Sequence, residues 1–297
     1  MSYVVTAATG QVGSAVVNYL LSQSVSVRAV IRSESRSEYF TSRNIEVAIA
    51  DLTNADALTK AFQGAKAVFA MNPPVYETSD MNTAAMKVSN ALAAAIQAAQ
   101  VPRVVILSSV GAEKSSGTGN ILTTHILEET LKGTAPQIVI IRCAWFMENW
   151  FKSVSAVKLG QSPVLGSMLQ KLERKIPQVA TDDIGRVAAE YMTKPAQAVD
   201  RMVIVELEGP EPYSPNDVAQ IVSKALGKNI HAAAMTEEMI RGLFGKVGWP
   251  KETVDNWIEM VQGFDNDTIC WTTNGNVTRE KGTRTLDEVL GKVLSEK

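Results

Sequence analysis

The first strand and the turn that follows it constrain the fold most. The apolar run Tyr3–Val5 breaks into the small-residue turn Thr6–Gly13, and apolar residues at helical spacing follow. Gly10 and Gly13 keep side chains away from the backbone, so phosphate oxygens can approach the free N–H groups at the positive end of a helix. Ala7 stands where the full fingerprint has its first glycine. The turn indicates either a dinucleotide pyrophosphate site or an ordinary strand–turn–helix connection.

The first 142 residues alternate buried β-branched runs with amphipathic helices. This alternation predicts an α/β fold, a doubly wound parallel Rossmann sheet with helices on both faces. Further strands are expected over 25–31, 45–50, 67–71, 103–107 and 137–141, and helices near 12–22, 54–63, 79–99 and 120–132.

After residue 142 the regular alternation stops, apart from one helix over 181–192 and one strand over 202–207. Helix-capping patterns at Ser214–Asp217 and Thr236–Glu238 predict two more helices. We predict an NADP-binding Rossmann domain over 1–150, to which 179–208 return. A second, smaller, mostly helical lobe over 151–178 and 209–297 is expected to bind the substrate.

Charge and composition argue against several classes of protein. The net charge of −2 gives no basic surface for nucleic acid or anionic lipid. No apolar stretch reaches the roughly 18 residues of a membrane helix, and the first strand begins too early for a signal peptide. Two distant cysteines and two histidines predict neither a disulfide framework nor a metal site. We expect a cytoplasmic protein with a small-molecule substrate, and leave open a homodimer or a regulatory protein partner.

The end of the second strand carries Arg32, where an NAD-specific site would have an acidic residue. A guanidinium can make paired hydrogen bonds to a 2′-phosphate, so the site would prefer NADP(H). Arg28 on the same strand leaves the choice of arginine open, and Arg32 could also be a plain surface residue. After the third strand, Asp51 could accept from the adenine amino group while Leu52 covers the ring, or Asp51 could cap the next helix.

The fourth and fifth strands end in two further candidate stretches. Ala70-Met71-Asn72 and two prolines lie where ligands bind in open α/β folds, or form an ordinary loop. Ser108 and Ser109 could donate a hydrogen bond to a substrate oxygen. A short-chain dehydrogenase normally pairs such a serine with a tyrosine four residues before a lysine. No tyrosine in the sequence has that spacing.

On the helix where that pair would lie, His125 could donate a hydrogen bond to the nicotinamide ribose or to substrate, oriented by Glu129 from the next turn. It could equally be a packing residue. After the sixth strand, Trp145 and Phe146 would suit a planar substrate stacked over the nicotinamide, or would form the core between the lobes. Asn149 follows them as a further polar candidate.

Together these motifs resemble the NmrA-like atypical short-chain dehydrogenases, which include bacterial NADPH:quinone oxidoreductases. The resemblance rests on Val5–Gly13, Val30–Arg32, Ser108-Ser109, His125 with Glu129, and Ile141–Asn149, and extends loosely through Thr181–Gly185 and the helical tail. It implies NADP(H) as the cofactor and a substrate cleft between the lobes. The cofactor contacts would be Thr6, Thr9, Gly10, Gln11, Val12, Arg32, Asp51, Leu52, Ala70, Met71, Asn72 and Ser108.

The resemblance leads to two hypotheses of different classes. In the first, hydride passes from NADPH to a quinone or similar conjugated molecule under Trp145 and Phe146, with His125, Ser108 and Asn149 as catalytic residues. In the second, the chain senses NADP(H) without catalysis and regulates a partner protein. One departure concerns the turn: the methyl group of Ala7 is expected to require a negative φ or close packing.

Overall fold

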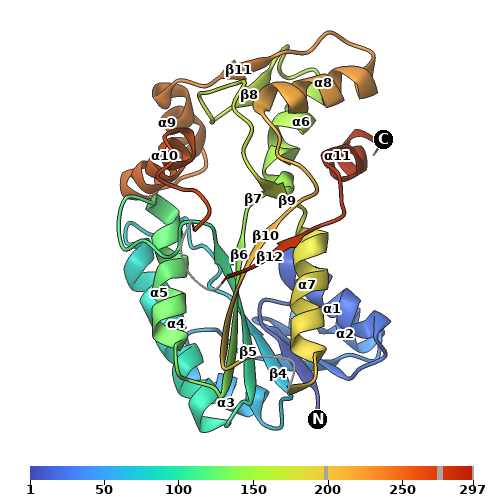
Figure 1. The fold of residues 1–297 in the computed structure, drawn as a ribbon, viewed down its shortest axis with the longest axis vertical. Helices are drawn as coiled ribbons and strands as arrows, with labels where there is room; N and C mark the ends of the chain where they lie inside the picture. The colour runs from blue at the N-terminus through green and yellow to red at the C-terminus, as the bar shows by residue number, and fades with distance from the viewer. Residues whose placement is uncertain (197–199, 273–276, 296–297) are drawn as a thin grey trace.

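The alternation of strands and helices expected for the first 142 residues is present (Figure 1). The glycine turn connects the first strand to the first helix. This computed structural model describes residues 1–196, 200–272 and 277–295. The strands are β1 Tyr3–Val5, β2 Val27–Ile31, β3 Glu46–Ile49, β4 Ala67–Ala70, β5 Arg103–Ser109, β6 Gln137–Cys143, β7 Trp145–Phe146, β8 Leu165–Ser167, β9 Gln178–Val179, β10 Met202–Glu208, β11 Ala232–Ala234 and β12 Val277–Lys281.

The helices follow the same order along the chain. They are α1 Gln11–Ser22, α2 Ser37–Thr41, α3 Ala55–Phe62, α4 Met81–Ala98, α5 Leu122–Leu131, α6 Phe151–Lys158, α7 Thr181–Thr193, α8 Pro215–Leu226, α9 Glu237–Gly245, α10 Lys251–Asp265 and α11 Leu286–Ser295. Three short 3₁₀ turns lie at η1 Glu34–Arg36, η2 Gly119–Ile121 and η3 Met147–Trp150.

One eight-stranded sheet organises the chain, in the order β12-β10-β6-β5-β4-β1-β2-β3. Every neighbouring pair in it is parallel. This confirms the predicted doubly wound parallel sheet. The strand order reverses at β1, and in open α/β sheets ligands bind at the carboxyl edge beside such a reversal.

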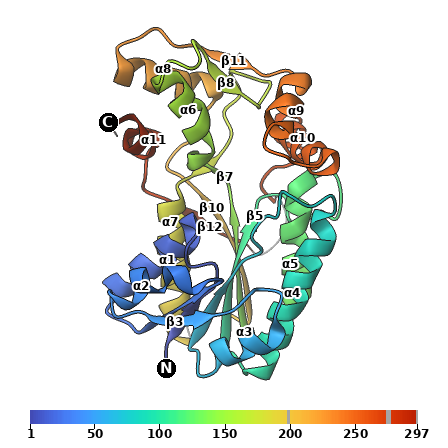
Figure 2. The same cartoon turned by 180° about the vertical axis from the view of Figure 1, so that it is seen from behind.

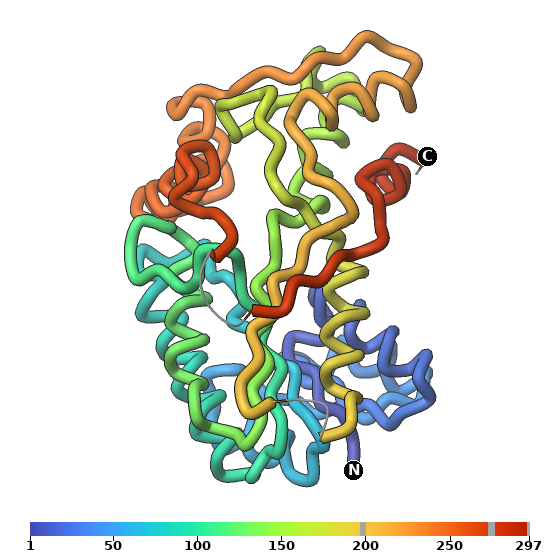
Figure 3. The backbone as a smooth tube through the Cα atoms, in the orientation of Figure 1, coloured from blue at the N-terminus to red at the C-terminus, as the bar shows by residue number. Residues whose placement is uncertain are grey.

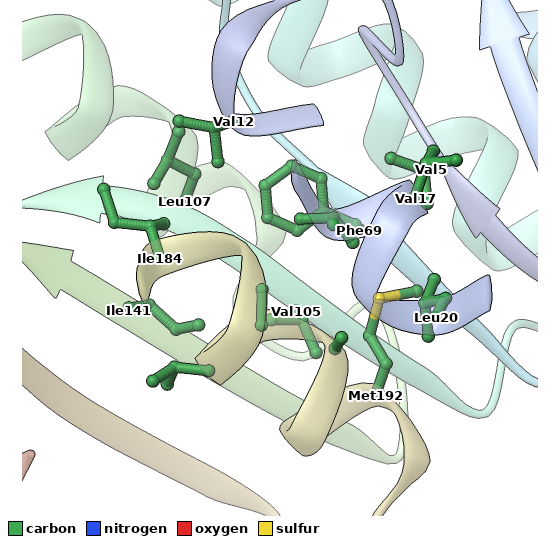
Figure 4. Close-up of a cluster of buried hydrophobic side chains, with 14 of the residues drawn as sticks. Val5, Val12, Val17, Leu20, Phe69, Val105, Leu107, Ile141, Ile184 and Met192 are labelled. Atoms are coloured by element: carbon green, nitrogen blue, oxygen red, sulfur yellow. The ribbon is translucent and has the colours of Figure 1, made fainter. Parts of the chain in front are cut away.

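Helices cover both faces of this sheet, with α1 and α7 on one side and α3, α4 and α5 on the other (Figures 1 and 2). Alternate residues of each central strand serve the two faces: Val105 and Leu107 of β5 pack under α1 and α7, whereas Val104 and Ile106 pack under α4 and α5. Figure 4 shows the first of these cores, where Leu20 of α1 and Met192 of α7 approach the sheet. Such near-continuous apolar strands are what a doubly covered sheet requires.

The smaller lobe lies beyond the carboxyl edge of the sheet and is built on α6, α8, α9, α10 and α11 (Figure 1). Its own core gathers Trp150, Val154, Tyr213, Val222 and Leu290. Two pairs of short strands, β8 with β11 and β7 with β9, add small sheets to the predicted helices. In the described part of the chain no helix is long and apolar enough to cross a membrane.

The tail does not stay in the smaller lobe throughout. Residues 209–297 were expected there, but β12 returns to the large sheet and pairs with β10 (Figure 3). Arg279 of β12 lies 3.2 Å from Glu206 of β10, and Tyr191 of α7 donates a 2.7 Å hydrogen bond to Glu280. An edge strand of this kind is charged and only half covered, so it lacks the apolar run that identifies a buried strand in a sequence.

Candidate functional site

The glycine turn presents free backbone donors at the carboxyl edge of the sheet. Gly10 is the extended N-cap of α1 and has no side-chain cap. The N–H groups of Gln11 and Val12 have no acceptor among the described residues, as is usual in a first helical turn. A Cβ at Gly13 would lie 2.3 Å from the carbonyl oxygen of Ala7, so only glycine fits there. The turn can therefore receive a phosphate group on backbone N–H groups alone.

Ala7 corrects one expectation about this turn. Its φ is +47°, in the left-handed region, whereas the sequence led us to expect either a negative φ or close packing around the methyl group. Its carbonyl oxygen accepts a 2.9 Å hydrogen bond from the N–H of Gly10, and this bond closes the turn. Ala7 thus adopts a left-handed backbone conformation that glycine adopts readily, and its methyl group makes this conformation unfavourable.

Replacing Ala7 by glycine should therefore stabilise the protein. Removing the methyl group from the left-handed position stabilises the folded state by about 1–2 kcal/mol. The greater backbone freedom of glycine in the unfolded chain lowers the stability by about 0.4–1 kcal/mol. Denaturant unfolding of Ala7→Gly should show a gain of about 0.5–1 kcal/mol. Ala8→Gly is the control, because Ala8 is fully buried with an ordinary φ and should lose stability. Equal losses in both variants would contradict the account.

The other residues of the turn divide between support and exposure. Thr6 is fully buried, and its hydroxyl donates a 2.9 Å hydrogen bond to the carbonyl oxygen of Phe69 in β4. The side chain of Val12 is buried in the core below. Thr9 and Gln11 are exposed beside Gly10. Side-chain contacts to a cofactor are therefore available to Thr9 and Gln11, whereas Thr6 holds the turn against the sheet.

The structure distinguishes the two arginines of β2 and its end. Arg28 donates to the carbonyl oxygens of Ala61 (2.7 Å) and Gln63 (2.9 Å) and lies 2.8 Å from Glu46. Arg32 is exposed and makes no hydrogen bond or ion pair within the described ranges. Arg28 is thus occupied by the fold, and Arg32 is the guanidinium that can meet a 2′-phosphate.

Asp51 and Leu52 lie after β3, as expected. Asp51 does not cap α3, since Asn54 is the N-cap and accepts from the N–H of Ala57. Hydrogen bonds from the hydroxyl and N–H of Thr53, with a smaller contribution from the charge of Arg32, lower the pKa of Asp51. These bonds use Oδ1 and leave Oδ2 without a hydrogen-bond donor among the described residues, so an acceptor is available for an adenine amino group.

The loop after β4 is anchored at several points. Ala70 and Asn72 are buried and Met71 is half-buried. The side-chain amide of Asn72 donates a 3.2 Å hydrogen bond to the carbonyl oxygen of Thr123 in α5. Further along, the ring of Tyr76 stacks on Trp249 of the smaller lobe, with centroids 4.1 Å apart. Burial raises the pKa of this tyrosine to about 12. This loop therefore joins the cofactor edge of the sheet to the smaller lobe.

Ser108 is committed to a buried ion pair. Its hydroxyl donates to Oε1 of Glu128 on α5, and both residues are buried. Glu128 also accepts from Arg142 of β6, at 3.0 Å from Nε and 2.7 Å from Nη2. Ser108 was expected to donate to a substrate oxygen, but in this arrangement its proton points at a carboxylate. Only its lone pairs remain for a substrate.

The sequence reasoning missed Glu128 and gave Arg142 no role. Ser108, Arg142 and Glu206 lie side by side on β5, β6 and β10. Burial would lower the pKa of Arg142, but its hydrogen bonds and charge interactions with Glu128, together with Glu113, raise it. The sequence does carry one sign of this ion pair, because Arg142 directly follows the apolar run Ile138–Ile141 and so is expected to be buried. A buried charge requires a partner of opposite charge.

His125 has a defined tautomer. Its Nδ1 lies 2.8 Å from the carbonyl oxygen of Ala112. A carbonyl oxygen only accepts, so Nδ1 carries a proton. Nε2 of the neutral ring is then an acceptor for a ligand, whereas the ring had been expected to donate to the ribose or to substrate. Glu129 was expected to orient this ring, but it pairs with Lys132 instead. His125 is half-buried at the start of α5, and the carbonyl group of Ala112 does the orienting.

The aromatic stretch after β6 is divided between core and surface. Trp145 is buried in the smaller lobe's core and meets Phe264 edge-on, with centroids 5.2 Å apart. The same cluster includes Val110 and Ile121 of the larger domain, so Trp145 has the core position between the lobes that the sequence left open beside a substrate contact. Phe146 is half-buried and Asn149 is exposed. A planar substrate could reach Phe146 and Asn149, but not the Trp145 ring in this packing.

A cavity of about 210 Å³ lies beside the carboxyl ends of β5 and β10. Its apolar walls are Val110, Ile176, Pro177, Phe264, Ile269 and Trp271. The N–H of Val110 donates to the carbonyl oxygen of Cys143, and the indole N–H of Trp271 donates to Glu208. These bonds fix the cavity to the ends of β6 and β10. In the described chain no group of three or more His, Cys, Asp and Glu side chains could hold a metal ion.

Comparison with known sequences adds an independent finding. The NmrA-like family matches residues 2–290. The chain is 24% identical over 259 residues to the NAD(P)H azoreductase of Xenophilus azovorans, over 86% of this chain and 85% of that protein. It is 29% identical over 154 residues to agroclavine dehydrogenase of Claviceps fusiformis, over 51% of this chain and 50% of that protein.

Solved structures share the fold over their whole length. Triphenylmethane reductase of Citrobacter sp., complexed with NADP(H), has a TM-score of 0.79 at 18% identity and covers 99% of this chain and 100% of its own. An NADPH-dependent quinone oxidoreductase of Escherichia coli, complexed with NADPH, has a TM-score of 0.79 at 21% identity and the same coverage. At these identities the likeness establishes the fold. The family match spans residues 2–290, which include the glycine turn and all eight strands of the large sheet. The chain therefore belongs to the NmrA-like family.

Proposed function

We propose that this protein is an NADPH-dependent reductase that transfers hydride to a quinone or a similar conjugated small molecule. The observation that carries the proposal is the pairing of two free donor groups at the carboxyl edge. The first turn of α1 offers unpartnered backbone N–H groups, and Arg32 offers an exposed guanidinium without an ion pair in the described residues. A pyrophosphate and a 2′-phosphate are the anions that such donors suit.

The residues present fit this cofactor. Gly13 leaves no room for a side chain between the turn and α1, and Asp51 offers an acceptor for adenine. Leu52, which was expected to cover the adenine ring, is buried in the core beside Leu58. When bound, NADPH supplies a hydride, that is, two electrons and one proton. The names of the relatives, an azoreductase and a quinone oxidoreductase, support a reductase acting on conjugated acceptors.

The side chains at the carboxyl edge of the sheet suit a hydride acceptor that needs little acid catalysis. A quinone that receives a hydride becomes a stabilised anion, and one further proton from water completes the hydroquinone. Nε2 of His125 and the lone pairs of Ser108 are hydrogen-bond acceptors, so they suit a hydroxyl group of the nicotinamide ribose or of the hydroquinone product; neither residue belongs to a Tyr–Lys pair. Asn149 is exposed on the turn that follows Phe146 and could contact the acceptor from the lobe side.

Steady-state oxidation of NADPH with a panel of quinones tests the proposal. Turnover is expected with at least one conjugated acceptor, and no turnover is expected with simple ketones, which need an acid. Cofactor binding should be measured in parallel by calorimetry. Tight NADPH binding with no turnover on any acceptor would reject the reductase and favour the second hypothesis, an NADP(H)-sensing regulator. That regulator would then bind a partner protein differently with NADP⁺ and with NADPH.

The cofactor preference gives a separate prediction. Arg32→Asp should weaken NADPH binding by roughly 10- to 100-fold, because one or two charge-assisted hydrogen bonds become a repulsion, while NADH binding is nearly unchanged. Calorimetric titration of both dinucleotides measures this. Arg28→Gln is the matched control, since Arg28 holds Glu46 and Ala61. It should lower stability and leave the ratio of the two affinities unchanged. An unaltered NADPH affinity in Arg32→Asp would show that Arg32 is a plain surface residue.

A further inference from the structure

The cavity beside the ends of β5 and β10 combines rigid apolar walls with a cationic segment. We infer that it binds a planar aromatic molecule carrying an acidic group, a carboxylate or a sulfonate. This inference rests on the proposed function, in which such a molecule is the hydride acceptor. It narrows the acceptors from conjugated molecules in general to anionic aromatic ones.

Two aromatic rings of the walls, Phe264 and Trp271, are each fixed by a neighbouring residue. Phe264 is held by Trp145, edge-on at a centroid distance of 5.2 Å, and Trp271 is held by its 3.2 Å hydrogen bond to Glu208. Ile269 packs so closely on Gly111 that a Cβ there would lie 3.2 Å from its Cγ2. Pockets for drug-sized ligands measure roughly 300–1,000 Å³. At about 210 Å³ this cavity suits one or two fused rings.

The charge comes from one short segment. Lys171, Arg174 and Lys175 lie within five residues, and the last two line the cavity with Asp267. Arg174 already bonds to Asp267 and to the carbonyl oxygen of Asp265 at 3.0 Å. Lys175 is the other cation of the wall, and its own partner is Asp217 of α8. A carboxylate or sulfonate on the ring would find this cation next to the apolar walls.

Lys175 is placed to exchange partners. Its side chain is 55% exposed, and its ammonium lies 3.5 Å from Asp217. The same oxygen of Asp217 already accepts from the N–H and the hydroxyl of Ser214, both at 2.8 Å, in the capping box of α8. An exposed ion pair of this kind is worth little. Lys175 can therefore turn to a ligand while Asp217 keeps its capping bonds.

The first test measures binding without turnover. The full-length protein is titrated by calorimetry with 2-naphthoate and with its neutral analogue 2-naphthamide, neither of which accepts hydride. We expect 2-naphthoate to bind about tenfold more tightly, as one charge-assisted contact allows. Lys175→Gln should remove most of this preference and Lys175→Arg should keep it. Lys228→Gln is the control, because Lys228 is exposed on another part of the lobe. Equal binding of the two compounds, or an unchanged preference in Lys175→Gln, would overturn the inference.

The second test separates this inference from the proposed function. KM is compared for 1,2-naphthoquinone and its 4-sulfonate, in the wild type and in Lys175→Gln. A lower KM for the sulfonate that rises in the variant supports both proposals. If neither quinone is reduced but the naphthoate preference depends on Lys175, the reductase fails and the anion site stands. If both quinones are reduced equally well in both proteins, the reductase stands and the anion site fails.

Discussion

Adding one methyl group at Gly185 will destabilise the protein by about 1–3 kcal/mol, the usual range for overpacking a tight core. Gly185 lies on α7 where this helix crosses α1. A Cβ there would lie 2.4 Å from the Cβ of Ala15 and 2.6 Å from its carbonyl carbon. Because part of the obstacle is backbone, the clash cannot be relieved by rotating a side chain, and the two helices must separate.

The measurement is the free energy of unfolding of Gly185→Ala in a denaturant titration. Gly291→Ala is the matched control, since Gly291 also lies within a helix but has nothing within 4 Å of the added Cβ. That variant should gain about 0.5–1 kcal/mol from the better helix propensity of alanine. If Gly185→Ala were as stable as the wild type, the close crossing of α1 and α7 would be wrong.

The same variant should also weaken NADPH binding, because α1 carries the donors of the glycine turn. Displacement of α1 by a few tenths of an ångström moves the N–H groups of Gln11 and Val12 relative to Arg32, and both sites must hold one cofactor. Calorimetry should therefore show a lower affinity for NADPH in Gly185→Ala than in Gly291→Ala. Equal affinities would indicate that the helices adjust without moving the turn.

The parts of the fold that follow from local pattern were predictable. The glycine turn, the buried strands β4, β5 and β6, and the capping box at Ser214 are each determined by residues close together in sequence, so periodicity and capping chemistry identify them. The position of Arg32 at the end of a strand was predictable for the same reason. The sequence does not show which of Arg28 and Arg32 is available to a phosphate. Arg28 is engaged by Glu46 of β3 and Ala61 of α3, and these residues are distant from it in sequence.

The rest depends on partners that are distant in sequence. The residues near Ser108 in sequence do not show that its hydroxyl donates a hydrogen bond to Glu128, since these two residues meet only when α5 packs on β5. Trp145 looks like a substrate platform until Phe264 of α10 is placed against it. Strand β12 lies at the edge of the sheet and carries charged residues, so it lacks the run of apolar residues from which a buried strand is predicted. Sequence patterns therefore locate the cofactor side of the site better than the substrate side.

Glu128→Ala should cost about 3–5 kcal/mol of stability, because it leaves the guanidinium of Arg142 buried without its carboxylate. Glu128 and Arg142 are both almost fully buried, and two hydrogen bonds join them at 3.0 and 2.7 Å. Glu113 lies 3.5 Å from the other side of the guanidinium and is too distant to replace a bidentate partner. Denaturant unfolding measures the loss.

Glu129→Ala is the control, one residue along the same helix. Glu129 pairs with Lys132 at the surface, so its removal should cost at most about 0.5 kcal/mol. The double variant Glu128→Leu with Arg142→Met should regain much of the lost stability, because it removes both buried charges. Ser108 would then lose its acceptor, and the effect on KM for quinones would show whether the orientation of Ser108 matters for the substrate. Similar small losses in Glu128→Ala and Glu129→Ala would mean that water reaches Arg142 and that the ion pair is not buried.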